Sequence, residues 1–145
     1  MTLDRLFEIT KELGIEIDDV PMRELRAVAY PQKWIAIDRR KFANDTEYKC
    51  ALAHEIGHCE TGSFYRVGAH EHDRDLNEHH ANRYAAELLL PLSDLLHAMH
   101  TGTLFEHILA RTHDVTREFA AMVLELYDNE LCTAARTWSA ATIGR

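Results

Sequence analysis

Two histidines and a glutamate are spaced as a catalytic metal site requires. His54 and His58 are the first and last residues of an HExxH run in which Glu55 is the second. On a helix that turns about 100° per residue, positions 54 and 58 lie about 40° apart and one turn apart, so both imidazoles can reach one ion. Glu55 projects about 100° away, which suits a group that holds a water rather than the ion itself. The motif therefore predicts a zinc hydrolase with Glu55 as its catalytic residue.

The flanking residues predict a helix long enough to carry the motif. Asn44 followed three residues later by Glu47 is typical of a capping-box start, and Gly62 is a plausible C-cap. These signals predict a helix over about 17 residues, from near position 45. Gly57 inside it costs about 1 kcal/mol relative to alanine. Its presence indicates either that another backbone or a substrate comes close there, or that the residue is incidental.

A catalytic zinc also needs a third protein ligand and an open fourth position. In segment 77–91, projected as a helix, Glu78 shares a stripe with Ala81 and other small or apolar residues. Such a stripe would let two helices approach closely and would turn Glu78 toward the histidines. We therefore expect Glu78 to bind zinc, with Asn82 one turn on bonded to a ligand imidazole. The alternative is that Glu78 completes a capping box with Asp75.

The segment between the two motif-bearing helices, residues 63–73, lacks periodicity and is predicted to be a loop near the site. A group that stabilises the substrate oxyanion stays unassigned at this point. The candidates all have a hydrogen-bond donor and are Tyr65, His70, His72 and Tyr84. A further metal-ligand role for either histidine is less favoured than a place in a polar loop.

Taken together, the two motifs resemble the ImmA/IrrE family of small bacterial zinc peptidases. The resemblance is carried by HEIGH at 54–58 and by ExxANRYAAELLLP at 78–91, and it covers about positions 25 to 100. HEIGHCETGSFY at 54–65 is similar to the branch of that family found on mobile genetic elements. The resemblance implies a gluzincin-like fold in which zinc is held by the two histidines and Glu78, with Glu55 as general base.

That branch also implies a substrate. Its members accompany a helix-turn-helix repressor on phages and integrative elements and inactivate it by site-specific cleavage, which makes them anti-repressors in transcription regulation. The resemblance thus implies a zinc metalloendopeptidase whose protein substrate is a repressor encoded next door. One departure from larger gluzincins is Asn82, where an aspartate commonly orients a ligand histidine; an amide oxygen can accept the same bond, without charge. An alternative is a non-proteolytic anti-repressor that binds and sequesters a transcriptional regulator.

Length and composition predict one domain over residues 1–145, because 145 residues with 46% hydrophobic content can bury one core. The first 100 residues would hold the N-terminal helix, the sheet and the metal-site helices, and residues 101–145 a helical part. The sequence shows no signal-peptide pattern, no run of 18 apolar residues and only three cysteines, so we expect a cytoplasmic protein without a membrane segment. A net charge of -8 disfavours direct nucleic-acid binding and tolerates a basic protein partner.

The remaining pattern predicts an α+β fold. Apolar residues at helical spacing predict a first helix from Leu3 to Leu13, and short β-prone runs at 15–18, 25–30 and 34–37 predict a small antiparallel sheet beside the HExxH helix. The resemblance implies that a sheet edge near the metal pairs with an extended substrate. Run 34–37 is the candidate edge, and a core strand is equally compatible with it.

After Pro91 the sequence predicts helices only, at 92–100, 103–111 and 115–127. The turn between the last two faintly suggests a helix-turn-helix, but the second helix carries acids as well as Arg117, which favours a packed helical pair. Residues from Cys132 onward are small and polar and are expected to fray.

Overall fold

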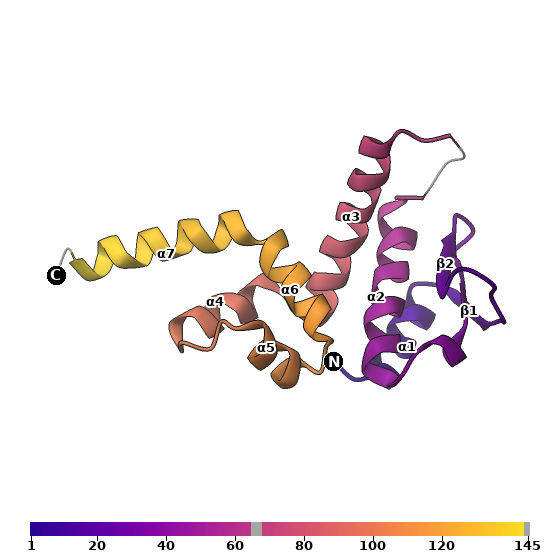
Figure 1. Cartoon of the computed structure of the whole chain (residues 1–145), viewed down its shortest axis with the longest axis horizontal. Coiled ribbons are helices and arrows are strands. Elements are labelled where there is room, and N and C mark those ends of the chain that lie inside the picture. Colours follow the sequence, from indigo (N-terminus) through magenta and orange to yellow (C-terminus); the bar gives the residue numbers. More distant parts are fainter. Residues whose placement is uncertain (65–67, 144–145) are drawn as a thin grey trace.

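The computed structural model describes residues 1–64 and 68–143. It confirms the predicted α+β fold with a helical C-terminal part. In Figure 1, α2 lies between the sheet and α3, and α7 projects away from the other elements. Within these described ranges, no helix is both long and apolar enough to cross a membrane. The elements in chain order are α1 (Leu3–Glu12), β1 (Glu16–Asp19), β2 (Ala27–Tyr30), β3 (Trp34–Ile37), the 3-10 turn η1 (Arg39–Lys41), α2 (Asp45–Thr61), α3 (Glu71–Leu89), α4 (Leu92–His100), α5 (Glu106–His113), α6 (Arg117–Leu126) and α7 (Asp128–Ile143).

Local signals determine both ends of α2, as predicted. The Asn44 side chain accepts a hydrogen bond from the backbone N–H of Glu47 (2.9 Å), and the Glu47 carboxylate accepts one from the N–H of Ala43 (3.1 Å). Gly62 ends the helix in the left-handed region, at φ 64°. The glycine is suited to this position because it has no Cβ to strain there.

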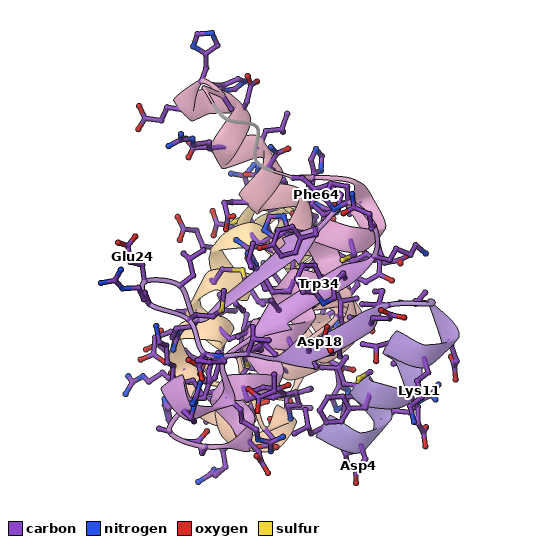
Figure 2. The ribbon with its side chains drawn as sticks, turned by 90° about the vertical axis from the view of Figure 1, so that its right-hand side faces the viewer. Asp4, Lys11, Asp18, Glu24, Trp34 and Phe64 are labelled. Atoms are coloured by element: carbon purple, nitrogen blue, oxygen red, sulfur yellow. The ribbon has the colours of Figure 1, made fainter. Side chains whose placement is uncertain are left out.

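The sheet has the order β1-β3-β2, and only one of its two pairings is antiparallel. β2 and β3 form the antiparallel pair, joined by a three-residue turn that ends at Lys33 with φ 56°. β3 lies between the other strands and runs parallel to β1. The prediction of a purely antiparallel sheet was wrong because hairpin β2–β3 inserts its second strand next to β1. Figure 2 shows Trp34 of β3 beside Asp18 of β1, and the indole N–H donates to the Asp18 carboxylate (2.7 Å).

This strand order corrects the predicted substrate edge. Run 34–37 is the central strand, with Ile35 and Ile37 completely buried, so of the two readings the core strand is right. The strand that lines the cavity beside the HExxH motif is β2. Strand order depends on contacts distant in sequence, which local pattern does not encode.

The backbones of α2 and α3 meet at Gly57 and Ala81. A Cβ placed on Gly57 would lie 2.4 Å from the carbonyl oxygen of Ala81, so no side chain fits at that point. Gly57 is therefore required by a second backbone, which settles the open interpretation of this residue. α3 begins at Glu71, earlier than expected, and Asp75 lies inside it. The capping-box alternative for Glu78 was therefore wrong.

In the C-terminal part, α4 has its predicted bounds, whereas α5 begins at Glu106 without a side-chain cap. The Thr103 hydroxyl instead bonds back to the carbonyl of Ala98. α7 continues to Ile143, where fraying was expected. Its helix forms despite few buried residues, since after Leu131 its side chains are partly or fully exposed as far as residue 141.

An ion pair between buried Lys49 and exposed Asp114 connects the α5–α6 turn to α2. The Lys49 side chain on α2 is 1% exposed, and its ammonium donates to the Asp114 carboxylate and to the Met1 carbonyl, both at 2.9 Å. The Thr46 hydroxyl donates to the other Asp114 oxygen (2.6 Å). A buried ammonium needs such acceptors, because an unpaired buried charge is strongly destabilising.

Asp114→Asn tests this fastening through its pH dependence. The hydrogen bonds from Thr46 and Lys49 lower the pKa of Asp114 below its ordinary value of 3.8. Such a carboxylate stabilises the fold above its unfolded pKa and loses that contribution as the pH falls. We expect the variant to lose about 1 kcal/mol of unfolding free energy at pH 7, a modest amount because Asp114 is largely exposed. Urea unfolding should show that the difference in unfolding free energy between wild type and Asp114→Asn is smaller at pH 3 than at pH 7. Asp75→Asn is the control and should unfold as wild type does at both pH values. An equal loss by Asp114→Asn at both pH values would contradict the assignment.

Candidate metal centre

Three candidate ligand residues, His54, His58 and Glu78, converge between α2 and α3. The Nε2 atoms of His54 and His58 are 3.1 Å apart, and they lie 3.2 and 3.3 Å from the two carboxylate oxygens of Glu78. Tetrahedral ligands at zinc–ligand distances of about 2.0–2.1 Å stand about 3.2–3.4 Å from one another. The spacing and the donor set, two imidazoles and one carboxylate, therefore fit a zinc ion with an open fourth position.

The far nitrogens of both imidazoles are held by hydrogen bonds. Nδ1 of His54 lies 2.8 Å from the amide oxygen of Asn82, and Nδ1 of His58 lies 2.5 Å from the backbone carbonyl of Ser63. Each acceptor fixes the tautomer with the proton on Nδ1, so each Nε2 lone pair points into the cluster. The sequence predicted the Asn82 contact. It did not predict Ser63, since a backbone carbonyl has no residue signature.

The electrostatics of the cluster favour a cation. Hydrogen bonds from the imidazoles of His54 and His58 in their protonated form lower the pKa of Glu78 to about 2, so Glu78 is a carboxylate at neutral pH. Burial lowers the pKa of His54, but the hydrogen bond to Glu78 and the charges of Glu55 and Glu78 outweigh it and raise the pKa overall. The site thus stabilises positive charge between its imidazoles, and a metal ion would supply that charge.

Glu55 lies beside the three ligands and belongs to the same cavity. Burial raises its pKa above the ordinary 4.5, while the neighbouring imidazoles and a hydrogen bond from the Ala29 backbone act in the opposite direction. A carboxylate whose pKa is raised in this way is a better proton acceptor at neutral pH. Glu55 thus lies in the cavity with the three candidate ligands without belonging to the ligand cluster.

The cavity has a volume of about 270 Å³, and its second wall is strand β2. The Asp38 N–H donates to the Arg26 carbonyl across the β2–β3 pair, and in an antiparallel pair every second residue bonds to the partner strand. The N–H and C=O groups of Ala27 and Ala29 therefore point away from β3. This edge of β2 lies along the cavity, and its Ala29 N–H donates to the Glu55 carboxylate. Phe64 and Leu25 add apolar surface at its sides.

The other predicted candidates lie apart from the cluster. Burial raises the pKa of Tyr84, and the charges of Glu60 and Glu87 raise it further. Tyr84 does not line this cavity. His70 is the N-cap residue of α3 and lines a separate cavity, and His72 is exposed in the first turn of α3. Tyr65 lies outside the described residues. The structure thus brings together Glu55 and the three predicted ligands, with Asn82 behind them.

A partly buried carboxylate next to three candidate metal ligands, in a cavity lined by strand β2, is the arrangement of a metallopeptidase-type centre. Comparison with protein families agrees. The Peptidase M78 family model, described as the IrrE N-terminal-like domain, matches residues 10–125, and the chain belongs to that family. The resemblance to the ImmA/IrrE family predicted from the two motifs is thereby confirmed. A search among curated proteins gave no match.

Gly57→Ala tests whether the helix crossing positions the metal ligands. Helix propensity alone would make this change stabilising by about 1 kcal/mol. We expect the opposite, because the new Cβ would push the Ala81 backbone away and carry Glu78 with it. Zinc affinity, measured by competition with a chelator, should fall by about tenfold or more. A variant that is more stable and binds zinc as wild type does would refute this explanation; Ala51→Gly on the same helix is the propensity control.

Asn82 variants test the hydrogen bond to His54. We expect Asn82→Leu to weaken zinc binding by about 10–100-fold, because the imidazole loses the acceptor that fixes its tautomer. Asn82→Asp should bind zinc at least as tightly as wild type, since the carboxylate accepts the same bond with a full charge. The same chelator competition measures both. Equal affinity in all three proteins would show that Asn82 does not position His54.

Proposed function

We propose that this protein is a zinc-dependent endopeptidase that acts in the cytoplasm. The observation that carries the proposal is the convergence of three ligand side chains, with contacts of 3.1–3.3 Å between them, and of Glu55 next to them in a cavity bounded by the β2 edge. Membership of a peptidase family supports it. A structural metal alone would not require a buried carboxylate that faces the cavity without belonging to the ligand set.

The residues divide the chemistry among themselves. A zinc ion bound by His54, His58 and Glu78 would acidify water and polarise the peptide carbonyl. Glu55 accepts the proton of the attacking water at its carboxylate and returns it to the leaving amine. Asn82 and the Ser63 carbonyl keep both imidazoles in the orientation that ligation needs. The β2 edge aligns the substrate backbone, so that the bond to be cut lies over the cluster.

We further propose that the substrate is a helix-turn-helix repressor of a phage or integrative element, encoded beside this protein, and that cleavage relieves repression. Support comes from the family to which the chain belongs and from charge. The chain carries a net charge of -8, and DNA-binding repressors present basic surfaces. Opposite charge would speed their encounter at low ionic strength. An extended repressor segment is the form that a strand edge can bind.

Glu55→Gln is the decisive variant for peptidase activity. We expect it to bind about one zinc per chain and to remain folded, because glutamine keeps the shape of glutamate, yet to lose cleavage of the neighbouring repressor almost completely. Mass spectrometry of the repressor after incubation measures cleavage, and elemental mass spectrometry measures zinc. Glu87→Gln, on the exposed side of α3, is the matched control and should cut as wild type does. Cutting by Glu55→Gln at the wild-type rate would remove Glu55 from the role of base.

A second measurement separates cleavage from binding. Relief of repression in a reporter strain is expected for wild type and for Glu87→Gln, and to be lost in Glu55→Gln. If Glu55→Gln relieves repression fully while the repressor stays intact, the protein acts by sequestering the regulator and the peptidase proposal fails. Glu78→Ala should lose zinc as well as activity, which links both readouts to the metal.

A further inference from the structure

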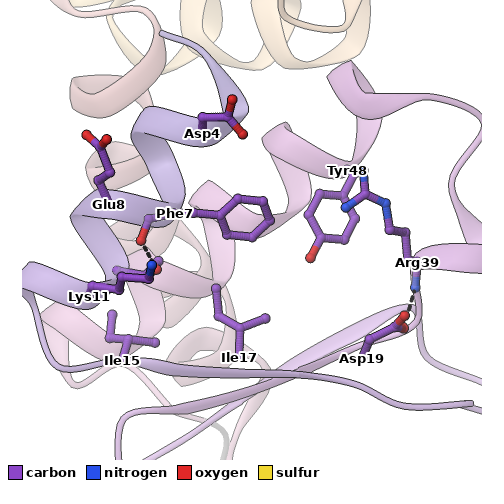
Figure 3. Close-up of a pocket in the computed structure, with 10 residues that line it drawn as sticks. Asp4, Phe7, Glu8, Lys11, Ile15, Ile17, Asp19, Arg39 and Tyr48 are labelled. Atoms are coloured by element: carbon purple, nitrogen blue, oxygen red, sulfur yellow. Dashed lines mark hydrogen bonds between the residues drawn. The ribbon is translucent and has the colours of Figure 1, made fainter.

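A second cavity lies near the N-terminal end of the metal-site helix, between α1, β1 and the first turn of α2. Its volume is about 700 Å³, within the range of sites for small molecules, and none of the metal-centre residues lines it. Figure 3 shows its interior, with the rings of Phe7 and Tyr48 facing each other above Ile15 and Ile17. The walls come from α1, β1, η1 and α2, and the floor is apolar.

One polar group inside this cavity lacks a partner. Tyr48 is only 4% exposed, and within the described part of the chain no hydrogen bond reaches its hydroxyl. Figure 3 shows that hydroxyl directed into the open space near Ile17 and Asp19. The oxygen itself is not fully buried, so it meets the open space of the cavity and is available to a group bound there.

The charged groups around the cavity favour a ligand with a positive charge. Three carboxylates line it, those of Asp4, Glu8 and Asp19, and Asp19 is the one that faces the Tyr48 hydroxyl. Asp19 uses one oxygen to accept the backbone N–H of Arg39 (3.1 Å). The guanidinium of Arg39 also lines the cavity, but it is bound to Asp45 (2.6 Å), and Lys11 lies on the α1 side. A cationic group can therefore donate hydrogen bonds to carboxylate oxygens that line the cavity, whereas the same carboxylates would repel an anion.

We propose that this cavity binds a small amphipathic amine. Its apolar body packs on Phe7, Ile15 and Ile17, and its ammonium donates to the Tyr48 hydroxyl oxygen and to the Asp19 carboxylate. The net charge of -8 attracts such a cation at long range. The site is separate from the metal centre and does not depend on peptidase activity. Tyr48 precedes His54 by six residues, about 9 Å along the axis of the same helix.

The test uses 4-phenylbutylammonium as the probe, titrated into the zinc-loaded full chain and followed by amide chemical shifts. The carboxylate 4-phenylbutyrate and the neutral 4-phenylbutanol have nearly the same apolar body and serve as charge controls. We expect saturable shifts at the amides of Phe7, Ile17 and Tyr48, with the ammonium binding at least about tenfold more tightly than the carboxylate. Absence of saturable shifts at these amides, equal binding of both charges, or shifts confined to Ala29 beside the metal would overturn the proposal.

Two variants assign the polar contacts. Tyr48→Phe keeps the ring and removes the hydroxyl, and Asp19→Asn keeps an acceptor for the Arg39 N–H while removing the charge. Each should weaken ammonium binding about threefold or more, and Asp19→Asn should also reduce the preference over the alcohol. Asp75→Asn, outside the cavity, is the matched control and should bind as wild type does. If a lysine-rich peptide shifts the same amides and the free amine does not, the occupant is a protein segment and the small-molecule proposal is wrong.

Discussion

The contact between the backbones of α2 and α3 is the constraint on which the site depends. Two helices can touch in this way only where one of them lacks a side chain, and Gly57 provides that place against the Ala81 carbonyl. The functional residues have the same spacing around the contact on both helices. On α2 the histidines stand at positions −3 and +1 from Gly57, and on α3 Glu78 and Asn82 stand at −3 and +1 from Ala81. The single helix crossing therefore determines the positions of both Glu78, the third ligand, and Asn82, whose amide bonds His54.

α2 is surrounded by other elements on most of its circumference, which explains its sequence. Its histidines face α3, Glu55 faces β2, Tyr48 faces α1, and Lys49 meets the turn before α6. A helix buried on several sides has no single apolar stripe, because each face must match a different neighbour. Polar residues inside it are then acceptable only when each has a partner. Lys49 and His58 have such partners, and in the part of the chain described here the Tyr48 hydroxyl has none.

The features that the sequence predicted correctly are those determined by short-range rules. The bounds of α2 follow from Asn44, Glu47 and Gly62, and the position of Glu78 follows from helical spacing once the HExxH motif is seen. The features it missed depend on distant contacts or on the backbone. The central place of β3, the Ser63 carbonyl behind His58 and the length of α7 have no local signature. The candidates for oxyanion stabilisation were chosen because their side chains can donate a hydrogen bond. Without the fold, this criterion could not predict that Tyr84 lies outside the cavity.

The strand order also implies a sequence of events during folding. β2 and β3 are joined by a three-residue turn, so they can pair after closing a very short loop. β1 can pair only with β3, and that parallel contact closes a loop of more than a dozen residues. The hairpin is thus expected to form before β1 joins it. The strand edge beside the metal ligands would then exist early, while the cavity at the N-terminal end of α2, whose wall includes β1, would be among the last parts of the molecule to be completed.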